Sequence, residues 1–132
     1  MTKATPSPLS DADAIAALEP IYPDLVVDPT VAGRVRTLVQ ALDVDYRHYA
    51  RDLAQAEAER REAERFGPPA TVTYWKCRQN DAGEAAQRTA GALAEALALL
   101  KLVTGETPEH PRNAVARARW AAVDRRAAGE GR

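Results

Sequence analysis

The chain has 132 residues, a formal net charge of −1 and a single cysteine, Cys77. This length suits one domain whose core needs no metal or disulfide, and a lone cysteine excludes an internal disulfide, as is usual in a reducing compartment. Hydrophobic residues reach 45% of the sequence but aromatic residues only 5%, and most of the difference is alanine. Long helices that approach closely are therefore expected, rather than a thick core.

The sequence indicates neither a signal peptide nor a membrane span. The first residues, MTKATPSPLSDADA, lack the apolar stretch of a signal peptide. The most apolar run, GALAEALALLKLV over residues 91–103, is too short to cross a bilayer and contains Glu95 and Lys101. We therefore expect a cytoplasmic protein with no membrane partner.

The N-terminal third begins with a segment rich in proline, serine and threonine. Residues 1–9 are expected to form a disordered tail, followed by one helical domain over 10–128 and a flexible C-terminus over 129–132. Ser10 can cap a short helix over about 11–18. Three prolines then predict an extended connector, because proline interrupts helices; they are Pro20, Pro23 and Pro29.

A long helix is predicted over about residues 29–66. Asp28 has the side chain of an N-cap, and Pro29 suits the first helical position. Apolar residues recur every seven positions through this stretch, as expected of a helix with one buried stripe. They are Val35, Leu42, Tyr49, Ala56 and Ala63, with Val39, Tyr46 and Leu53 between them.

A second long helix is predicted over about residues 72–104, after a turn in the sequence FGPPAT. The segment TVTYW has strand propensity, but no second strand is evident with which it could pair. Asp81 and Glu84 resemble a capping box, so a break or restart near Asn80 stays open. Gly105 is expected to end the helix.

The last predicted element is a helix over about residues 111–128. With the two long helices and the short N-terminal helix, it defines an all-α fold. Its centre is a long antiparallel helical hairpin, similar to a coiled coil, that turns back near Gly67.

Two groups of residues have side chains that could carry chemistry. Asp45, His48 and Asp52 share one side of a helix and could begin a divalent metal site, but the facing helix offers no histidine. Lys76 and Arg78 would favour the thiolate form of Cys77, yet a reactive thiol also needs a base.

The simpler interpretation treats these residues as structural. Cys77 is then a small packing residue, and Tyr74 and Trp75 fill the tip of the hairpin. No known catalytic motif is present. Neither an enzymatic activity nor a cofactor nor a metal is therefore predicted.

Charge is unevenly distributed along the chain, with an acidic N-terminal part and a basic C-terminal part. The ends could pair within one molecule, between copies or with separate partners. Several arginines could form one helical face that binds nucleic-acid phosphates or an acidic protein partner. They are Arg112, Arg117, Arg119, Arg125 and Arg126.

The function predicted from these patterns is a non-catalytic helical protein-interaction or oligomerisation module, acting as an adaptor, an assembly component or a regulator. The expected partner is a second copy or another protein. The expected packing interface is an alanine and leucine stripe with two aromatic residues: Ala86, Ala90, Leu93, Leu97, Leu100, Tyr74 and Trp75. The alternatives are a small nucleic-acid-binding subunit that uses the arginine face, and a metal-dependent helical-bundle enzyme centred on Asp45, His48 and Asp52.

Overall fold

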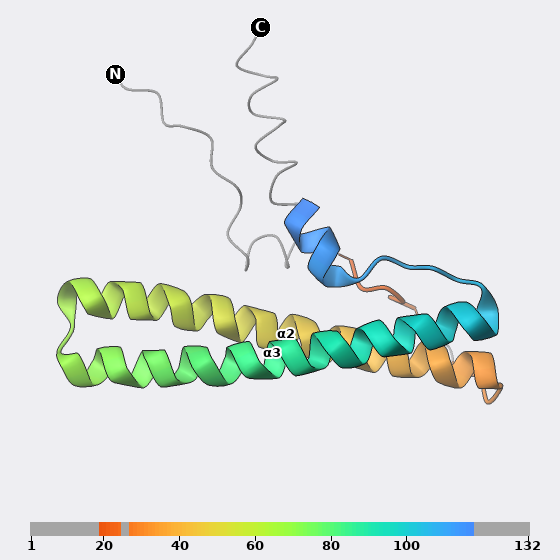
Figure 1. Cartoon of the computed structure of the whole chain (residues 1–132), viewed down its shortest axis with the longest axis horizontal. Coiled ribbons are helices and arrows are strands. Elements are labelled where there is room, and N and C mark those ends of the chain that lie inside the picture. Colours follow the sequence, from red (N-terminus) through yellow and green to blue (C-terminus); the bar gives the residue numbers. More distant parts are fainter. Residues whose placement is uncertain (1–18, 25–26, 118–132) are drawn as a thin grey trace, which may run out of the picture.

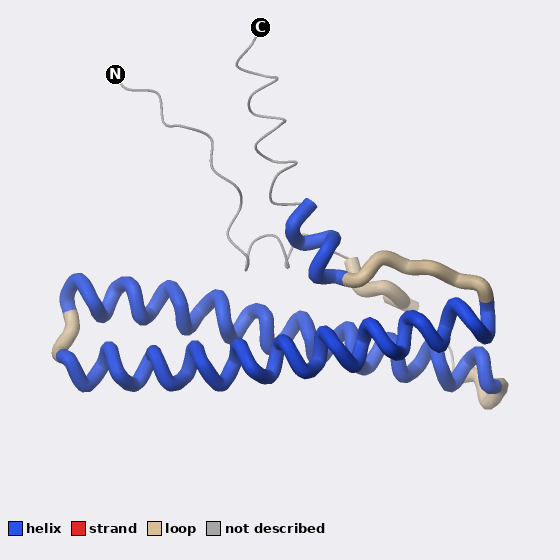
Figure 2. Tube along the Cα trace, in the orientation of Figure 1, coloured by secondary structure: helices blue, strands red, loops and turns tan. Residues whose placement is uncertain are grey.

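Two long antiparallel helices dominate the computed structural model, which describes residues 19–24 and 27–117. Helix α2 (Val31–Phe66) and helix α3 (Pro69–Thr104) have 36 residues each and pack along their length (Figure 1). A further helical stretch covers residues 111–117, and all regular structure within the described ranges is helical (Figure 2). The predicted all-α hairpin is thus confirmed. The predicted tail over 1–9, the helix over 11–18 and everything predicted beyond residue 117 lie outside the described residues.

Helix α2 begins two residues later than predicted. Thr30, not Asp28, is the N-cap, and its hydroxyl accepts a 3.1 Å hydrogen bond from the Gly33 N–H. The Asp28 carboxylate instead accepts a 3.0 Å bond from the Thr30 N–H. Pro29 therefore lies before the helix. Both residues favour a helix start, and the threonine lies closer to the first free N–H groups.

Helix α3 begins earlier than predicted and contains no break. It starts at Pro69, where a missing N–H costs nothing, and runs through TVTYW and Asn80 as regular helix. Gln79 is a polar residue beside the apolar stripe, and its side-chain oxygen accepts a 2.7 Å bond from Arg60 Nε of α2. The helix ends at Gly105, whose φ of 77° is the left-handed conformation that favours glycine.

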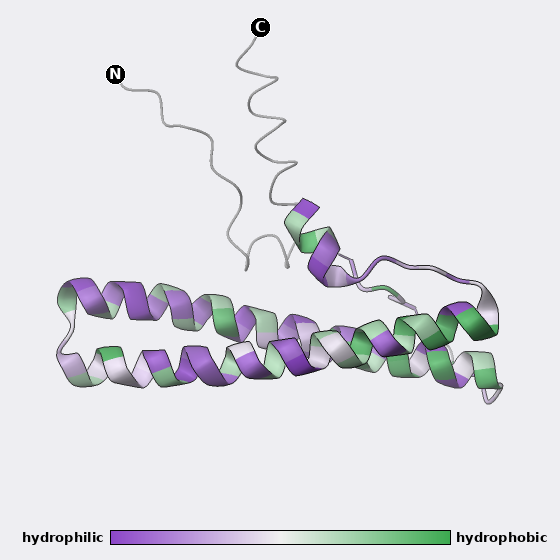
Figure 3. Ribbon diagram, in the orientation of Figure 1, coloured by the Kyte–Doolittle hydropathy of each residue, from purple (hydrophilic) through white to green (hydrophobic). Residues whose placement is uncertain are grey.

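The hydrophobic core lies in the half of the hairpin away from the turn, which we call the base. It contains Val35, Val39, Tyr46, Ala90, Leu93, Ala96 and Leu100. Three of these have no exposed surface, and each contributes roughly 1.5–3 kcal/mol by burial: Val39, Leu93 and Leu100. In the half near Gly67, which we call the tip, the buried hydrophobic residues are alanines. Apolar colours gather at the base and hydrophilic colours at the tip (Figure 3).

A buried ion pair fastens the N-terminal connector to α2. Asp43 is fully buried, and its carboxylate accepts hydrogen bonds from the Ile21 N–H (3.0 Å) and from Arg47 Nε (2.9 Å). The Arg47 guanidinium also donates a 2.7 Å bond to the Glu19 carbonyl. The pair therefore binds the backbone of the connector on both sides of Pro20.

A second polar cluster joins the connector to the segment that follows α3. Arg36 donates to the Glu106 carboxylate at 2.8 and 3.1 Å, and the Tyr22 hydroxyl donates to the same carboxylate. Burial, followed by the hydrogen bond to Glu106, raises the pKa of Tyr22 to about 12. The hydrogen bonds from Arg36 and then Tyr22 lower the pKa of Glu106.

His110 fastens the C-terminal segment to the hairpin. Its buried ring approaches Tyr46 edge-on, with 5.5 Å between ring centroids. Nε2 lies 2.9 Å from the Ala90 carbonyl oxygen, so this nitrogen carries the hydrogen, while Nδ1 accepts a 3.0 Å bond from the Arg112 N–H. The helical stretch over residues 111–117 therefore starts against the hairpin.

Candidate functional site

The connector and the C-terminal segment attach to the same flank of the hairpin, and this defines its covered face. On α2, the side chains that bind them are Arg36, Gln40, Asp43 and Arg47. Successive helical residues are about 100° apart, so residues two positions apart point in nearly opposite directions. The flank opposite the covered face therefore includes Leu38, which follows Arg36 by two residues. It also includes Tyr49, which follows Arg47 by two residues.

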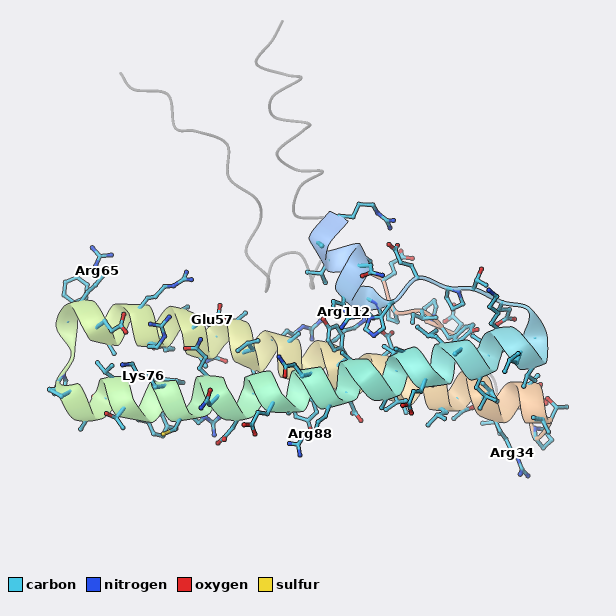
Figure 4. The ribbon with its side chains drawn as sticks, viewed as in Figure 1. Arg34, Glu57, Arg65, Lys76, Arg88 and Arg112 are labelled. Carbon is cyan, nitrogen blue, oxygen red and sulfur yellow. The ribbon has the colours of Figure 1, made fainter. Side chains whose placement is uncertain are left out.

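This opposite flank, covered by no described residue, exposes large apolar side chains at the base. The exposed fractions are 67% for Val31, 46% for Leu38, 43% for Leu99 and 40% for Val103. Arg34 and Arg88 point away from the side where residues 105–117 lie, whereas Arg112 is on that side (Figure 4). We call the surface formed by Val31, Leu38, Leu99 and Val103, and continued toward the tip by Tyr49 and Trp75, the open face.

At the tip the open face is hollowed into a shallow groove between the two helices. Its volume is about 210 Å³, and its walls include Tyr49 and Ala56 of α2 and Trp75 and Ala82 of α3. Steps of three and four residues from this part of α3 lead along the same flank to Leu99 and Val103.

A second hollow of about 220 Å³ shares Trp75 and reaches the turn at Gly67. Small-molecule pockets usually measure about 300–1,000 Å³ and enclose their ligand. Each hollow is smaller than that and formed between only two helices, so the pair is better suited to the side chains of a protein partner. Asp52 and Arg78 stand at the rim of the first groove.

The alanine and leucine stripe predicted as an outer interface is mostly buried inside the hairpin. Ala86, Ala90, Leu93 and Leu100 are buried in the chain itself, and Leu97 packs against the same core. The prediction that this stripe faces a second copy therefore needs correction, because helix α2 of the same chain covers it. Of the two aromatic residues predicted in the interface, Tyr74 is 54% exposed and Trp75 lines both hollows. The centroids of the Tyr74 and Trp75 rings are 5.0 Å apart.

The metal candidates do not form a three-ligand cluster. His48 Nε2 and Asp52 Oδ2 lie 3.4 Å apart; His48 is largely exposed, Asp52 is half-buried and Asp45 is exposed. Within the described ranges no three histidine, cysteine or acidic side chains are grouped so that they could hold a metal ion. The cysteine considered for reactivity, Cys77, is an exposed free thiol rather than a packing residue.

The arginine face is only partly within the described residues. Arg112 is exposed. Two nitrogens of the Arg117 guanidinium donate hydrogen bonds to the Glu109 carboxylate, and the bond from Nη1 is 2.9 Å long. The carboxylate therefore neutralises much of the Arg117 charge. Arg119, Arg125 and Arg126 lie outside the described residues.

Comparison with family models, curated proteins and solved structures finds no match to this chain. In the part of the chain that the structure describes, none of the helices has the length and apolarity needed to cross a bilayer.

The sequence did not single out the residues that distinguish the two faces. Asp43 and Arg47 form a pair four residues apart, which was a usable signal because acids are rare in apolar stripes. Leu38 also carries a signal, since it falls outside the seven-residue stripe predicted for the first long helix, and Leu99 and Val103 fall outside the alanine and leucine stripe predicted for the second. Such residues have no evident partner within the hairpin.

Proposed function

We propose that this protein is a non-catalytic helical interaction module that binds a protein partner through its open face, as an adaptor, assembly or regulatory component. The observation that carries the proposal is the alignment of exposed Val31, Leu38, Leu99 and Val103 on the flank opposite the covered face. Single exposed apolar residues are common on proteins, but contiguous patches tend to mark interaction sites.

The energetics support binding at this surface. Burying the exposed part of each large aliphatic side chain contributes on the order of 1 kcal/mol. The groove beside Trp75 adds an aromatic wall, and aromatic residues are enriched at the centres of protein interfaces. The rim residues Asp52 and Arg78 add polar groups of both signs, as is usual around an apolar centre.

Co-purification from the native host tests the proposal with two matched variants. Leu38→Glu places a charge in the open face, whereas Val44→Glu places the same charge at a 53% exposed valine elsewhere on α2. We expect the wild type and Val44→Glu to retain the same partner, which can be a differently tagged copy of the chain, and Leu38→Glu to lose it. Circular dichroism checks that both variants remain helical.

Two results would contradict the proposal. One is a partner that Leu38→Glu retains as well as the wild type does. The other is binding to DNA or RNA that weakens steeply with salt and is lost in Arg119→Glu/Arg126→Glu but not in Leu38→Glu. That second result would instead support the nucleic-acid-binding alternative.

A further inference from the structure

We infer that the partner at the open face is a second copy of this chain, and that two hairpins pack tip beside tip into a four-helix bundle. This inference rests on the proposed function and specifies its partner. Three properties of the open face favour it: the area, the distribution of apolar residues along the hairpin, and the arrangement of charge on the two helices.

The area is sufficient for a stable dimer. A helix of 36 residues is about 54 Å long, and two packed helices present a face about 20 Å wide. The open face therefore measures on the order of 1,000 Å², whereas a standard protein–protein interface buries about 800 Å² on each partner. Contact over most of its length would satisfy this requirement.

The apolar residues define the orientation. They concentrate at the base of the hairpin, whereas the tip is predominantly hydrophilic (Figure 3). If two copies stack with their tips at the same end, Leu38 and Leu99 of one copy meet the apolar base of the other. In the opposite orientation, these leucines would lie over the charged tip. The first arrangement has its two-fold axis along the hairpin and places α2 of each copy over α3 of the other.

The charges fit the same arrangement. Asp45, Asp52 and Glu59 are spaced seven residues apart along the open flank of α2. The open side of α3 carries both signs, with Arg78 and Asp81 at the groove and Arg88 seven residues before Glu95 (Figure 4). Because the helices are antiparallel and joined at residues 67–68, Asp45 is level with about Ala90 and Glu59 with about Lys76. With α2 over α3 of the second copy, Asp45 lies near Arg88 and Glu59 near Arg78.

The opposite orientation places like charges together. It stacks α2 over α2, so the acidic row of one copy faces the acidic row of the other. Asp81 is the acid that α3 contributes to the groove, and it lies three residues from Arg78 of its own helix. The acidic row of α2 therefore meets the arginines of α3 only when the tips are at the same end, which favours the tip-beside-tip dimer.

Sedimentation velocity of the 132-residue chain at tens of micromolar tests the inference. We expect a particle with twice the 14.3 kDa chain mass. Leu38→Glu should raise the dissociation constant at least about tenfold, whereas Val44→Glu should leave it unchanged. Arg88→Asp should also weaken the dimer, and adding Asp45→Arg to it should restore the affinity, because the exchanged charges meet again across the interface.

A monomeric wild type would overturn the inference, and so would a dimer that is indifferent to Leu38→Glu. A double variant no tighter than Arg88→Asp alone would overturn the orientation. A result against the dimer can be distinguished from a result against the proposed function. A monomer that still binds a different protein, and loses it in Leu38→Glu, would contradict self-association but leave the open face as an interaction surface.

Discussion

Asp43 is the polar side chain on which the covered face most depends. It is fully buried and binds both the connector backbone and Arg47. We expect Asp43→Ala to lower the free energy of unfolding by about 3 kcal/mol, because the buried guanidinium loses its carboxylate and the Ile21 N–H loses its acceptor. Urea unfolding followed by circular dichroism measures the change.

The matched control for this variant is Glu95→Ala, at an exposed acid of α3. It should change the free energy of unfolding by less than about 0.5 kcal/mol. If Asp43→Ala were as mild as Glu95→Ala, the buried pair would not be what holds the connector.

Tyr22 gives the covered face an alkaline pH dependence. Its pKa is raised from 10.0 to about 12, so folding favours the neutral phenol. The stabilisation is complete below pH 10 and is lost as the pH rises toward 12. Ultraviolet absorbance measures the ionisation of tyrosine as the pH rises. The difference between the wild type and Tyr22→Phe should show one phenol that ionises well above pH 10. Glu106→Gln should move its pKa back toward 10, whereas an unchanged titration would contradict the assigned hydrogen bond.

At the residue scale, the sequence predicted the core better than it predicted the polar contacts. Seven-residue spacing identified Val35, Val39 and Tyr46 because burial follows the helical period. The contact between Tyr22 and Glu106 joins residues 84 positions apart, and no local pattern encodes such a separation. The structural role of His110 depends on the Ala90 carbonyl, which has no sequence signature at all.

At the scale of the elements, two glycines in the long helices should respond to alanine in opposite ways. A Cβ on Gly33 would lie 2.5 Å from the Asp28 backbone oxygen and equally close to its Cβ, so the chain before the helix would have to move. We expect Gly33→Ala to destabilise the protein by about 1–2 kcal/mol. A Cβ on Gly91 would meet nothing within 4 Å. Gly91→Ala should therefore stabilise α3 by about 0.5–1 kcal/mol.

Thermal unfolding of the two glycine variants provides the comparison, since their chemistry is identical. If Gly33→Ala raised the melting temperature as Gly91→Ala is expected to do, the connector could not lie against α2 at Asp28.

The segment after α3 should depend on His110 for its attachment. His110→Ala removes the bonds to the Ala90 carbonyl and the Arg112 N–H as well as the ring contact with Tyr46. We expect trypsin to cut after Arg112 several-fold faster in this variant, because proteolysis follows local opening of the chain. Asn113→Ala, at an exposed neighbour, is the control. Equal cleavage rates in the two variants would contradict the attachment.

The start and end of each helix show which helix boundaries can be predicted from neighbouring residues alone. Gly67 and Gly105 were assigned correctly as helix ends because glycine and proline act within one turn. Asp28 and Thr30 both have cap chemistry, and the choice between them depends on the hydrogen bonds that form. The break that the sequence left open near Asn80 is absent because α2 supports α3 along its whole length, so tertiary packing outweighs the capping pattern.

At the scale of the whole molecule, the sequence predicted a hairpin but not its two faces. The apolar stripe along which the two helices pack is periodic, so it can be recognised in the sequence. Which flank the terminal segments cover depends on long-range contacts, such as Asp43 with Ile21 and His110 with Ala90. The inner stripe predicted as the interface is buried, and the interface that we propose lies on an outer flank that includes Leu38 and Leu99.

In the dimer that we propose, two copies associate through their open faces with their tips at the same end. Intermolecular dipolar distances test it most directly, with a spin label at Ala70→Cys near the turn, in a Cys77→Ser background that removes the native thiol. We predict a distance of about 20–30 Å between the two labels, set by the width of a four-helix bundle. A distance of about 50 Å, close to one full helix length, or no intermolecular distance at all, would contradict the claim.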